Sequence, residues 1–127
     1  MVKDTKIIKS VKESTVLSSC LRELQSWQAR GLVIYYTRVN SGKVKTEWGT
    51  WLQLAEKGTP DIFAFLNVNG SVHVYFIECK RPNGGIWGYE QQEFKFKFRD
   101  VKNVTYDLVD DYRQIARTIL KLTGSLE

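Results

Sequence analysis

The chain is poor in the residues that most metal and redox sites require. It has one histidine and two cysteines in 127 residues, and Cys20 lies far from Cys79 in the sequence. These counts exclude chemistry that needs a pair of imidazoles. Without a C-x-x-C pair they also exclude an iron–sulfur cluster or a structural zinc site. We expect both cysteines to be reduced thiols in the core of a cytoplasmic protein.

Long apolar runs and linkers are also missing. No apolar run approaches the roughly 20 residues of a membrane span. The segment Met1–Lys12 contains too many lysines for the apolar part of a signal peptide. Two prolines and no Pro- or Ser-rich stretch leave no sign of a domain boundary. We therefore expect one domain, residues 1–127, with no membrane partner.

The composition is that of a globular protein with a mild basic excess. Hydrophobic residues make up 43% of the chain and charged residues 26%, which excludes a disordered tail. The net charge of +5 permits binding to a polyanion but does not establish it.

Apolar periodicity predicts an α/β fold. Apolar residues spaced by three and four from about Ile7 to Arg30 predict an amphipathic helix, and Asp110 is expected to cap a closing helix. The remaining expected elements are strands over residues 32–39, 61–68, 71–80 and 104–109, a hairpin or flap over 43–56 and a helix over 89–100. The order α-β-β-β-α-β-α predicts a mixed β-sheet flanked by helices.

One predicted hairpin brings charged residues together. Asn69-Gly70 is a strong signal for a two-residue hairpin turn. A turn centred there puts Asp61 directly opposite Glu78, with their Cβ atoms about 4.5–5.5 Å apart on one face. Lys80 follows two residues later on the same face. A slip of one residue in register would send Asp61 to the other face.

This arrangement has two interpretations. A Glu-x-Lys triplet at a strand end is commonly a solvated ion pair. Two facing carboxylates, however, repel each other, and one lysine cannot neutralise both. A divalent cation between them removes the repulsion, and oxygen ligands favour Mg²⁺ or Mn²⁺ over Zn²⁺. The conjunction of Asp61 with Glu78 leads us to predict a metal site.

Several blocks occur in order between Glu13 and Val109. They are Glu13 itself, Arg38-Val39-Asn40-Ser41-Gly42, Gly58-Thr59-Pro60-Asp61, and Ile77-Glu78-Cys79-Lys80-Arg81-Pro82 before a Gly-rich break and a helix with Gln91. Together these blocks resemble the PD-(D/E)XK nuclease superfamily, and within it the VRR-NUC group known from phages and DNA-repair enzymes. The resemblance implies a restriction-endonuclease-like core and Mg²⁺- or Mn²⁺-dependent cleavage of DNA.

The resemblance also implies roles for individual residues. Asp61, Glu78 and the backbone carbonyl of Cys79 are expected to bind the metal, with Glu13 reaching a metal directly or through water. Lys80 is expected to orient the attacking water or to stabilise the transition state. Gln91 is expected to contact the nucleophile or the phosphate. Two alternatives stay open, since Gln92 also fits the glutamine role and Glu23 is a second acidic residue on the first helix.

Other residues are candidates for DNA contacts. Arginine favours bidentate phosphate contact, which suits Arg38 near the site. Lys3, Lys6, Lys9 and Lys12 recur every three residues, as either a basic stripe toward Glu13 or a solvated face. The predicted DNA-binding set is Arg38, Asn40, Ser41, Lys12 and Arg81. The tryptophans Trp48, Trp51 and Trp87 suit either stacking on unpaired bases or core and subunit contacts.

Together with the predicted metal site, the resemblance therefore implies a metal-dependent DNA endonuclease, which we expect to be guided more by DNA structure than by base sequence. One alternative is a Holliday-junction resolvase that acts as a homodimer on four-way DNA. Another is an inactive nucleic-acid-binding module. The expected partner is duplex or branched DNA, in the cytoplasm of a bacterium or of a phage-infected host cell.

Overall fold

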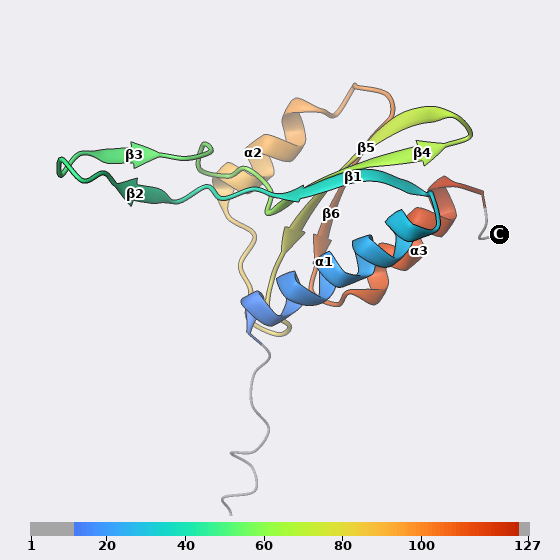
Figure 1. The fold of residues 1–127 in the computed structure, drawn as a ribbon, viewed down its shortest axis with the longest axis horizontal. Coiled ribbons are helices and arrows are strands. Elements are labelled where there is room, and N and C mark those ends of the chain that lie inside the picture. The colour runs from blue at the N-terminus through green and yellow to red at the C-terminus, as the bar shows by residue number, and fades with distance from the viewer. Residues whose placement is uncertain (1–11, 125–127) are drawn as a thin grey trace, which may run out of the picture.

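The computed structural model describes residues 12–124 as a mixed α/β fold (Figure 1). Three helices and a mixed four-stranded sheet form the body of this part of the chain. The element order is α1 (Glu13–Ala29), β1 (Val33–Arg38), β2 (Lys43–Lys45), β3 (Trp51–Gln53), β4 (Ile62–Val68), β5 (Ser71–Cys79), α2 (Tyr89–Lys97), β6 (Val104–Val109) and α3 (Arg113–Leu122). Without β2 and β3, this is the predicted order.

The four strands of the main sheet lie in the order β1-β4-β5-β6. The pairs β1–β4 and β4–β5 are antiparallel, whereas β5 and β6 are parallel and are joined through α2. Asn69 and Gly70 have φ values of 53° and 86°, as a tight hairpin turn between β4 and β5 requires. Ile62 pairs with Ile77 at the open end of this hairpin. The predicted turn and register are therefore both confirmed.

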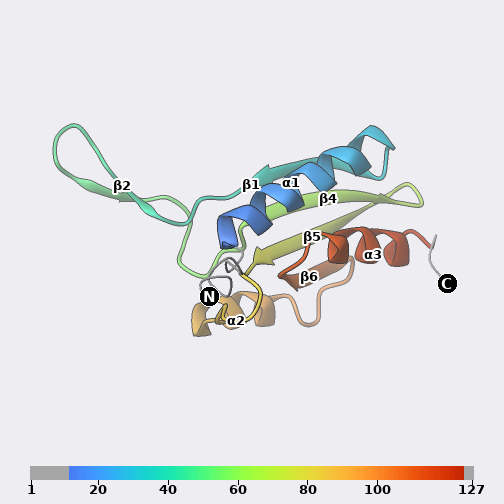
Figure 2. The same ribbon diagram turned by 90° about the horizontal axis from the view of Figure 1, so that it is seen from below.

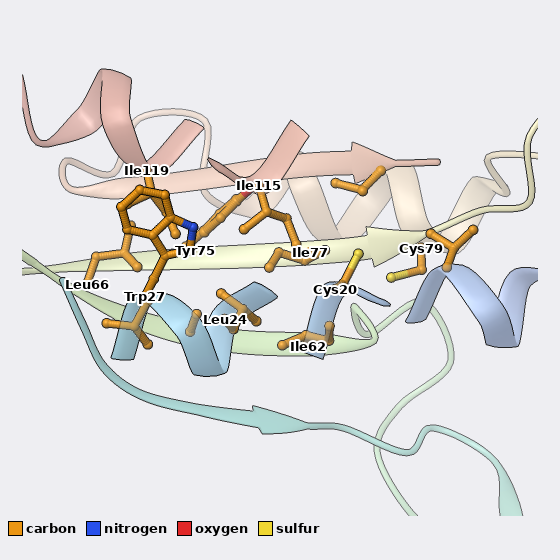
Figure 3. Close-up of a cluster of buried hydrophobic side chains, with 14 residues drawn as sticks. Cys20, Leu24, Trp27, Ile62, Leu66, Tyr75, Ile77, Cys79, Ile115 and Ile119 are labelled. Carbon is orange, nitrogen blue, oxygen red and sulfur yellow. The ribbon is translucent and has the colours of Figure 1, made fainter. Parts of the chain in front are cut away.

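The helices α1 and α3 cover one face of the sheet (Figure 2). Side chains from both helices and from the central strands form the core, which includes Leu24, Ile62, Tyr75, Ile77 and Ile115 (Figure 3). These five side chains have no exposed surface. Burial of a side chain such as leucine stabilises the fold by about 1.5–3 kcal/mol, so this layer holds β4 and β5 in place.

The helix α2 lies on the opposite side of the sheet from α1 and α3 (Figure 1), and its aromatic side chains pack against β5. Phe76 of β5 contacts Phe94 and Phe98, with ring centroids 5.0 and 4.9 Å away. Phe96 points outward and is 61% exposed. The alternation of phenylalanine and lysine over residues 94–98 resembles a strand, but two phenylalanines four residues apart suit one face of a helix. The predicted helix is confirmed.

The segment from Lys43 to Gln53 forms a separate two-stranded hairpin that we call the arm. It extends away from the body of the molecule (Figure 1). The prediction of a hairpin or flap in this region is thus confirmed as a hairpin.

Two helix starts differ from the predictions. The first helix begins at Glu13, since Lys12 has extended backbone angles, so it does not run unbroken from Ile7. The lysines at positions 3, 6 and 9 lie outside the described residues. The predicted cap Asp110 is wrong, because Tyr112 precedes the first residue of α3 and makes no side-chain cap. Asp111, one residue earlier, accepts the Arg113 N–H through its Oδ1 at 2.9 Å.

Cys20 and Cys79 are both buried and free, which confirms their predicted place in the core. The longest helix, α1, has 17 residues. Nothing in the described part of the chain combines the length and apolar character that a transmembrane helix needs.

Candidate functional site

The hairpin of β4 and β5 brings the predicted carboxylates to one end of the sheet. Since Ile62 pairs with Ile77, the next position outward places Asp61 opposite Glu78. Asp61 Oδ2 accepts the backbone N–H of Cys79 at 2.7 Å, which fixes the carboxylate against β5. The Asp61 carbonyl also accepts the Val39 N–H at 2.7 Å, so the residue is tied to both neighbouring strands.

Glu78 is the unusual residue of this site because its carboxylate is buried, with 3% of the residue exposed. Its Oε2 accepts a hydrogen bond from Gln91 Nε2 at 2.7 Å and lies 3.6 Å from Lys80 Nζ. Its Oε1 accepts no hydrogen bond, and every other buried side-chain nitrogen or oxygen in residues 12–124 has a hydrogen-bond partner. A buried charge without full compensation is costly, so this oxygen is suited to a ligand.

The electrostatic surroundings of Glu78 favour a proton or a cation. Burial, followed by the nearby charge of Asp61, raises the pKa of Glu78 to about 8, against an ordinary value of 4.5. Lys80 opposes the shift in this pKa, whereas the hydrogen bond that a protonated Glu78 shares with Asp61 and then the charge of Glu13 increase it further. The single ammonium group of Lys80 thus does not balance the carboxylates around it.

The start of α2 is fixed against the same site. Gln91 Oε1 accepts the Gly88 N–H at 2.8 Å while its amide nitrogen donates to Glu78. Gly58 lies against the first turn of α2, where a Cβ atom would come within 2.5 Å of the Glu90 carbonyl oxygen. Both contacts couple the position of α2 to the two carboxylates.

A cavity of about 350 Å³ opens over these side chains. Among the residues that line it are six of the predicted ones: Glu13, Ser41, Asp61, Glu78, Lys80 and Gln91. The predicted cluster is therefore brought together around one hollow. A larger cavity of about 760 Å³ lies over the outer surface of α2, but Asp61 and Glu78 do not line it.

Four of the predicted DNA contacts do not line this cavity. Arg38, Lys12, Asn40 and Arg81 are exposed, with Asn40 Oδ1 accepting the Gly42 N–H and Arg81 Nη2 donating to the Gly84 carbonyl. They remain candidates for contacts outside the cavity.

The two open alternatives lie away from the carboxylates. Gln92 donates to the Trp87 carbonyl at 2.9 Å, and Glu23 accepts the Trp27 indole N–H at 2.8 Å. Of the two glutamines, Gln91 is therefore the one in contact with Glu78. Of the two glutamates of α1, Glu13 lines the cavity and Glu23 does not.

The sequence interpretation missed Lys57 and Glu90, which also line the cavity. Glu90 occupies the first turn of α2, where an acidic residue is expected simply for its favourable interaction with the helix dipole. Its place at the site depends on the approach of Gly58 to α2. A long-range contact of this kind leaves no periodic signal in the sequence.

The donor set fits a hard divalent cation. No group of three or more His, Cys, Asp or Glu side chains within residues 12–124 is arranged to hold a metal ion. Mg²⁺ commonly takes only one or two carboxylates and completes its shell with water and substrate phosphates. Asp61 and Glu78, with the unpartnered Oε1, meet that requirement.

No protein-family model matches the chain, and comparisons with curated proteins and with solved structures also yielded no match.

Proposed function

We propose that the protein is a Mg²⁺- or Mn²⁺-dependent nuclease that hydrolyses phosphodiester bonds in DNA. In this proposal its sheet and helices correspond to the PD-(D/E)XK core, and the blocks between Glu13 and Val109 to the VRR-NUC group. The observation that carries the proposal is the buried carboxylate of Glu78, with one oxygen unpartnered and with Asp61 opposite it.

The metal would be held by Asp61 and Glu78, with the Cys79 carbonyl as the third protein ligand that the resemblance implies. Glu13 lines the same cavity and would contribute through water. When bound, such an ion supplies a Lewis acid that neutralises charge on the phosphate and acidifies water. The two carboxylates lie at the ends of adjacent strands, which would hold the ion rigidly.

The other two side chains of the proposed site have supporting roles, in stabilising the transition state and in positioning the Glu78 carboxylate. Lys80, whose side chain is 14% exposed, can offer its ammonium group to a phosphate as negative charge develops in the transition state. Gln91 uses its amide nitrogen on Glu78 and its oxygen on Gly88, so we assign it a positioning role for the Glu78 carboxylate. This differs from the direct contact with the nucleophile or phosphate that the sequence suggested.

The test is a cleavage assay on single-stranded, duplex, flapped and four-way DNA with Mg²⁺ or Mn²⁺. Asp61→Asn, Glu78→Gln and Lys80→Ala are each expected to abolish cleavage while the far-ultraviolet circular dichroism spectrum is unchanged. Asp100→Asn is the matched control, because Asp100 is exposed and pairs only with Arg99 at 3.7 Å among the described ion pairs. Persistent cleavage by purified Glu78→Gln protein would refute the proposal.

The same panel separates the alternative functions. A Holliday-junction resolvase would act on the four-way substrate as a homodimer, because a chain with one active site needs a partner to cut two strands symmetrically. DNA binding with no cleavage of any substrate under either metal would favour the inactive nucleic-acid-binding module.

A further inference from the structure

The arm, residues Lys43–Gln53, is not part of the main sheet or of the core described above. Among the described strands, its two strands pair only with each other, and the arm extends well beyond the main sheet (Figures 1 and 2). Trp48 at its turn is 82% exposed and Trp51 is 61% exposed. A two-stranded hairpin is marginally stable on its own in water, and grouped exposed apolar side chains mark interaction sites.

The two faces of the arm differ in chemistry. Lys45 pairs with Trp51 and Lys43 with Gln53, so these four side chains share one face. Lys45 Nζ lies 5.9 Å from the centre of the Trp51 ring, within cation–π range. Val44 and Leu52 occupy the other face. Ammonium groups beside an indole are the chemistry that proteins use for single-stranded nucleic acid.

The base of the arm is tied to the rim of the candidate site. Gln53 Nε2 donates to the carbonyls of Ser41 and Ala55, both at 2.6 Å. Asn40 accepts the Ala55 N–H through its carbonyl at 3.0 Å. Ser41 itself lines the cavity with Asp61 and Glu78. The base of the arm therefore lies at the rim of the cavity that holds the two carboxylates.

Resting on the nuclease function proposed above, we propose that the arm binds unpaired bases of branched or single-stranded DNA next to the scissile phosphate. Trp51 and Trp48 stack on the bases, and Lys43 and Lys45 contact the neighbouring phosphates. In intact duplex DNA each base is already stacked on its neighbours, so the indoles gain little there. The arm thereby selects DNA with an open region near the cut.

The experiment measures binding of the full chain to fluorescein-labelled flapped, single-stranded and duplex DNA by anisotropy, in EDTA so that no cleavage occurs. Base stacking is worth about 1–3 kcal/mol, so Trp48→Ala and Trp51→Ala are each expected to weaken binding to flapped and single-stranded DNA by roughly 5- to 150-fold. Binding to duplex should change much less. A 2-aminopurine base at the branch point should change its fluorescence when wild-type protein binds. It should not do so with the variant that carries both Trp48→Ala and Trp51→Ala.

Val72→Ala is the matched control. Val72 is a similarly exposed apolar residue, 54% exposed, beside the turn that joins β4 to β5. This variant should bind every substrate as the wild type does. Equal affinity of wild-type and arm variants for flapped and single-stranded DNA would overturn the inference. The inference would also be overturned if the wild type sedimented as a dimer and the arm variants as monomers, with unchanged DNA affinity per protomer. In that case the arm would contact a second copy of the chain.

The inference and the proposed function fail in different ways. Arm-dependent binding without cleavage under any metal supports the role of the arm and refutes the nuclease. Cleavage by wild-type protein, together with arm variants that bind open DNA normally, refutes the role of the arm and leaves the nuclease standing.

Discussion

Glu78 lies on a central strand with both faces covered, where an ionisable side chain is rare unless it is paired. Its partners serve only one of its two oxygens. If Glu78 served only to stabilise the fold, a neutral side chain of the same shape at this position would give a more stable protein. The proposed metal site gives a reason for a carboxylate at this position.

The buried carboxyl group of Glu78 should make the stability of the metal-free protein depend on pH. The folded chain holds the Glu78 proton up to a pKa of about 8, whereas the unfolded chain releases it near 4.5. Rising pH between these values therefore favours the unfolded chain. Glu78→Gln removes this loss, and its amide can donate a hydrogen bond toward Asp61, so the variant should gain stability relative to the wild type as pH rises.

Urea unfolding in EDTA at several pH values across this window measures the difference. Glu93→Gln is the control, because Glu93 is an exposed glutamate of α2. Parallel pH profiles for wild type and Glu78→Gln would show that Glu78 is ionised without cost in the folded protein.

The two neighbouring glutamines give a second prediction at this scale. Gln91→Ala removes the hydrogen bonds to Glu78 and to Gly88, and loss of such a positioning partner should lower cleavage by about 10- to 100-fold. Gln92→Ala removes only the contact with the Trp87 carbonyl and should leave cleavage near the wild-type rate. Steady-state cleavage rates with Mn²⁺ compare the two variants. A larger loss of cleavage in Gln92→Ala than in Gln91→Ala would contradict the positioning role of Gln91.

At the scale of elements, the turn before β4 and the start of α2 form one unit. Gly58 has φ +95°, and a Cβ atom there would meet the Glu90 carbonyl oxygen at 2.5 Å. Gly58→Ala should therefore cost about 2–5 kcal/mol, from left-handed backbone strain and overpacking together. It should also reduce cleavage, because α2 carries Gln91.

Gly70→Ala is the matched control for this unit. Gly70 has φ +86°, but no atom outside its chain neighbours lies within 4 Å of an added Cβ, so only the backbone strain of about 1–2 kcal/mol applies. Denaturant titration compares the two variants. Equal destabilisation would mean that the contact between Gly58 and α2 contributes nothing.

Elements whose signal is local could be predicted from the sequence. Asn69-Gly70 determined the register of β4 and β5, and with it the pairing of Asp61 with Glu78. The starts of α3 and α1 were misjudged. Asp110 has a side chain typical of a cap, but α3 begins only after Tyr112. Apolar spacing does not mark the first residue of a helix, and α1 begins after the extended residue Lys12. Lys57 and Glu90 could not be predicted, because packing between distant segments places them at the cavity.

At the scale of the whole molecule, the arm and the body are separate in structure. The core lies between the main sheet and the helices α1 and α3, and no residue of the arm belongs to it among those described (Figure 3). Replacing Lys43–Gln53 with a short Gly-Ser linker should therefore shift the melting temperature by less than about 4 °C. Leu24→Ala, a core truncation, should instead cost about 2–5 kcal/mol. A large loss of stability without the arm would contradict this division.

Titration calorimetry with Mn²⁺ tests whether Asp61 and Glu78 share one divalent cation. We expect wild-type protein to bind Mn²⁺, Asp61→Asn and Glu78→Gln each to weaken this binding, and Asp100→Asn to bind as the wild type does. Absence of Mn²⁺ binding by the wild type, or equal binding by all four proteins, would contradict this expectation.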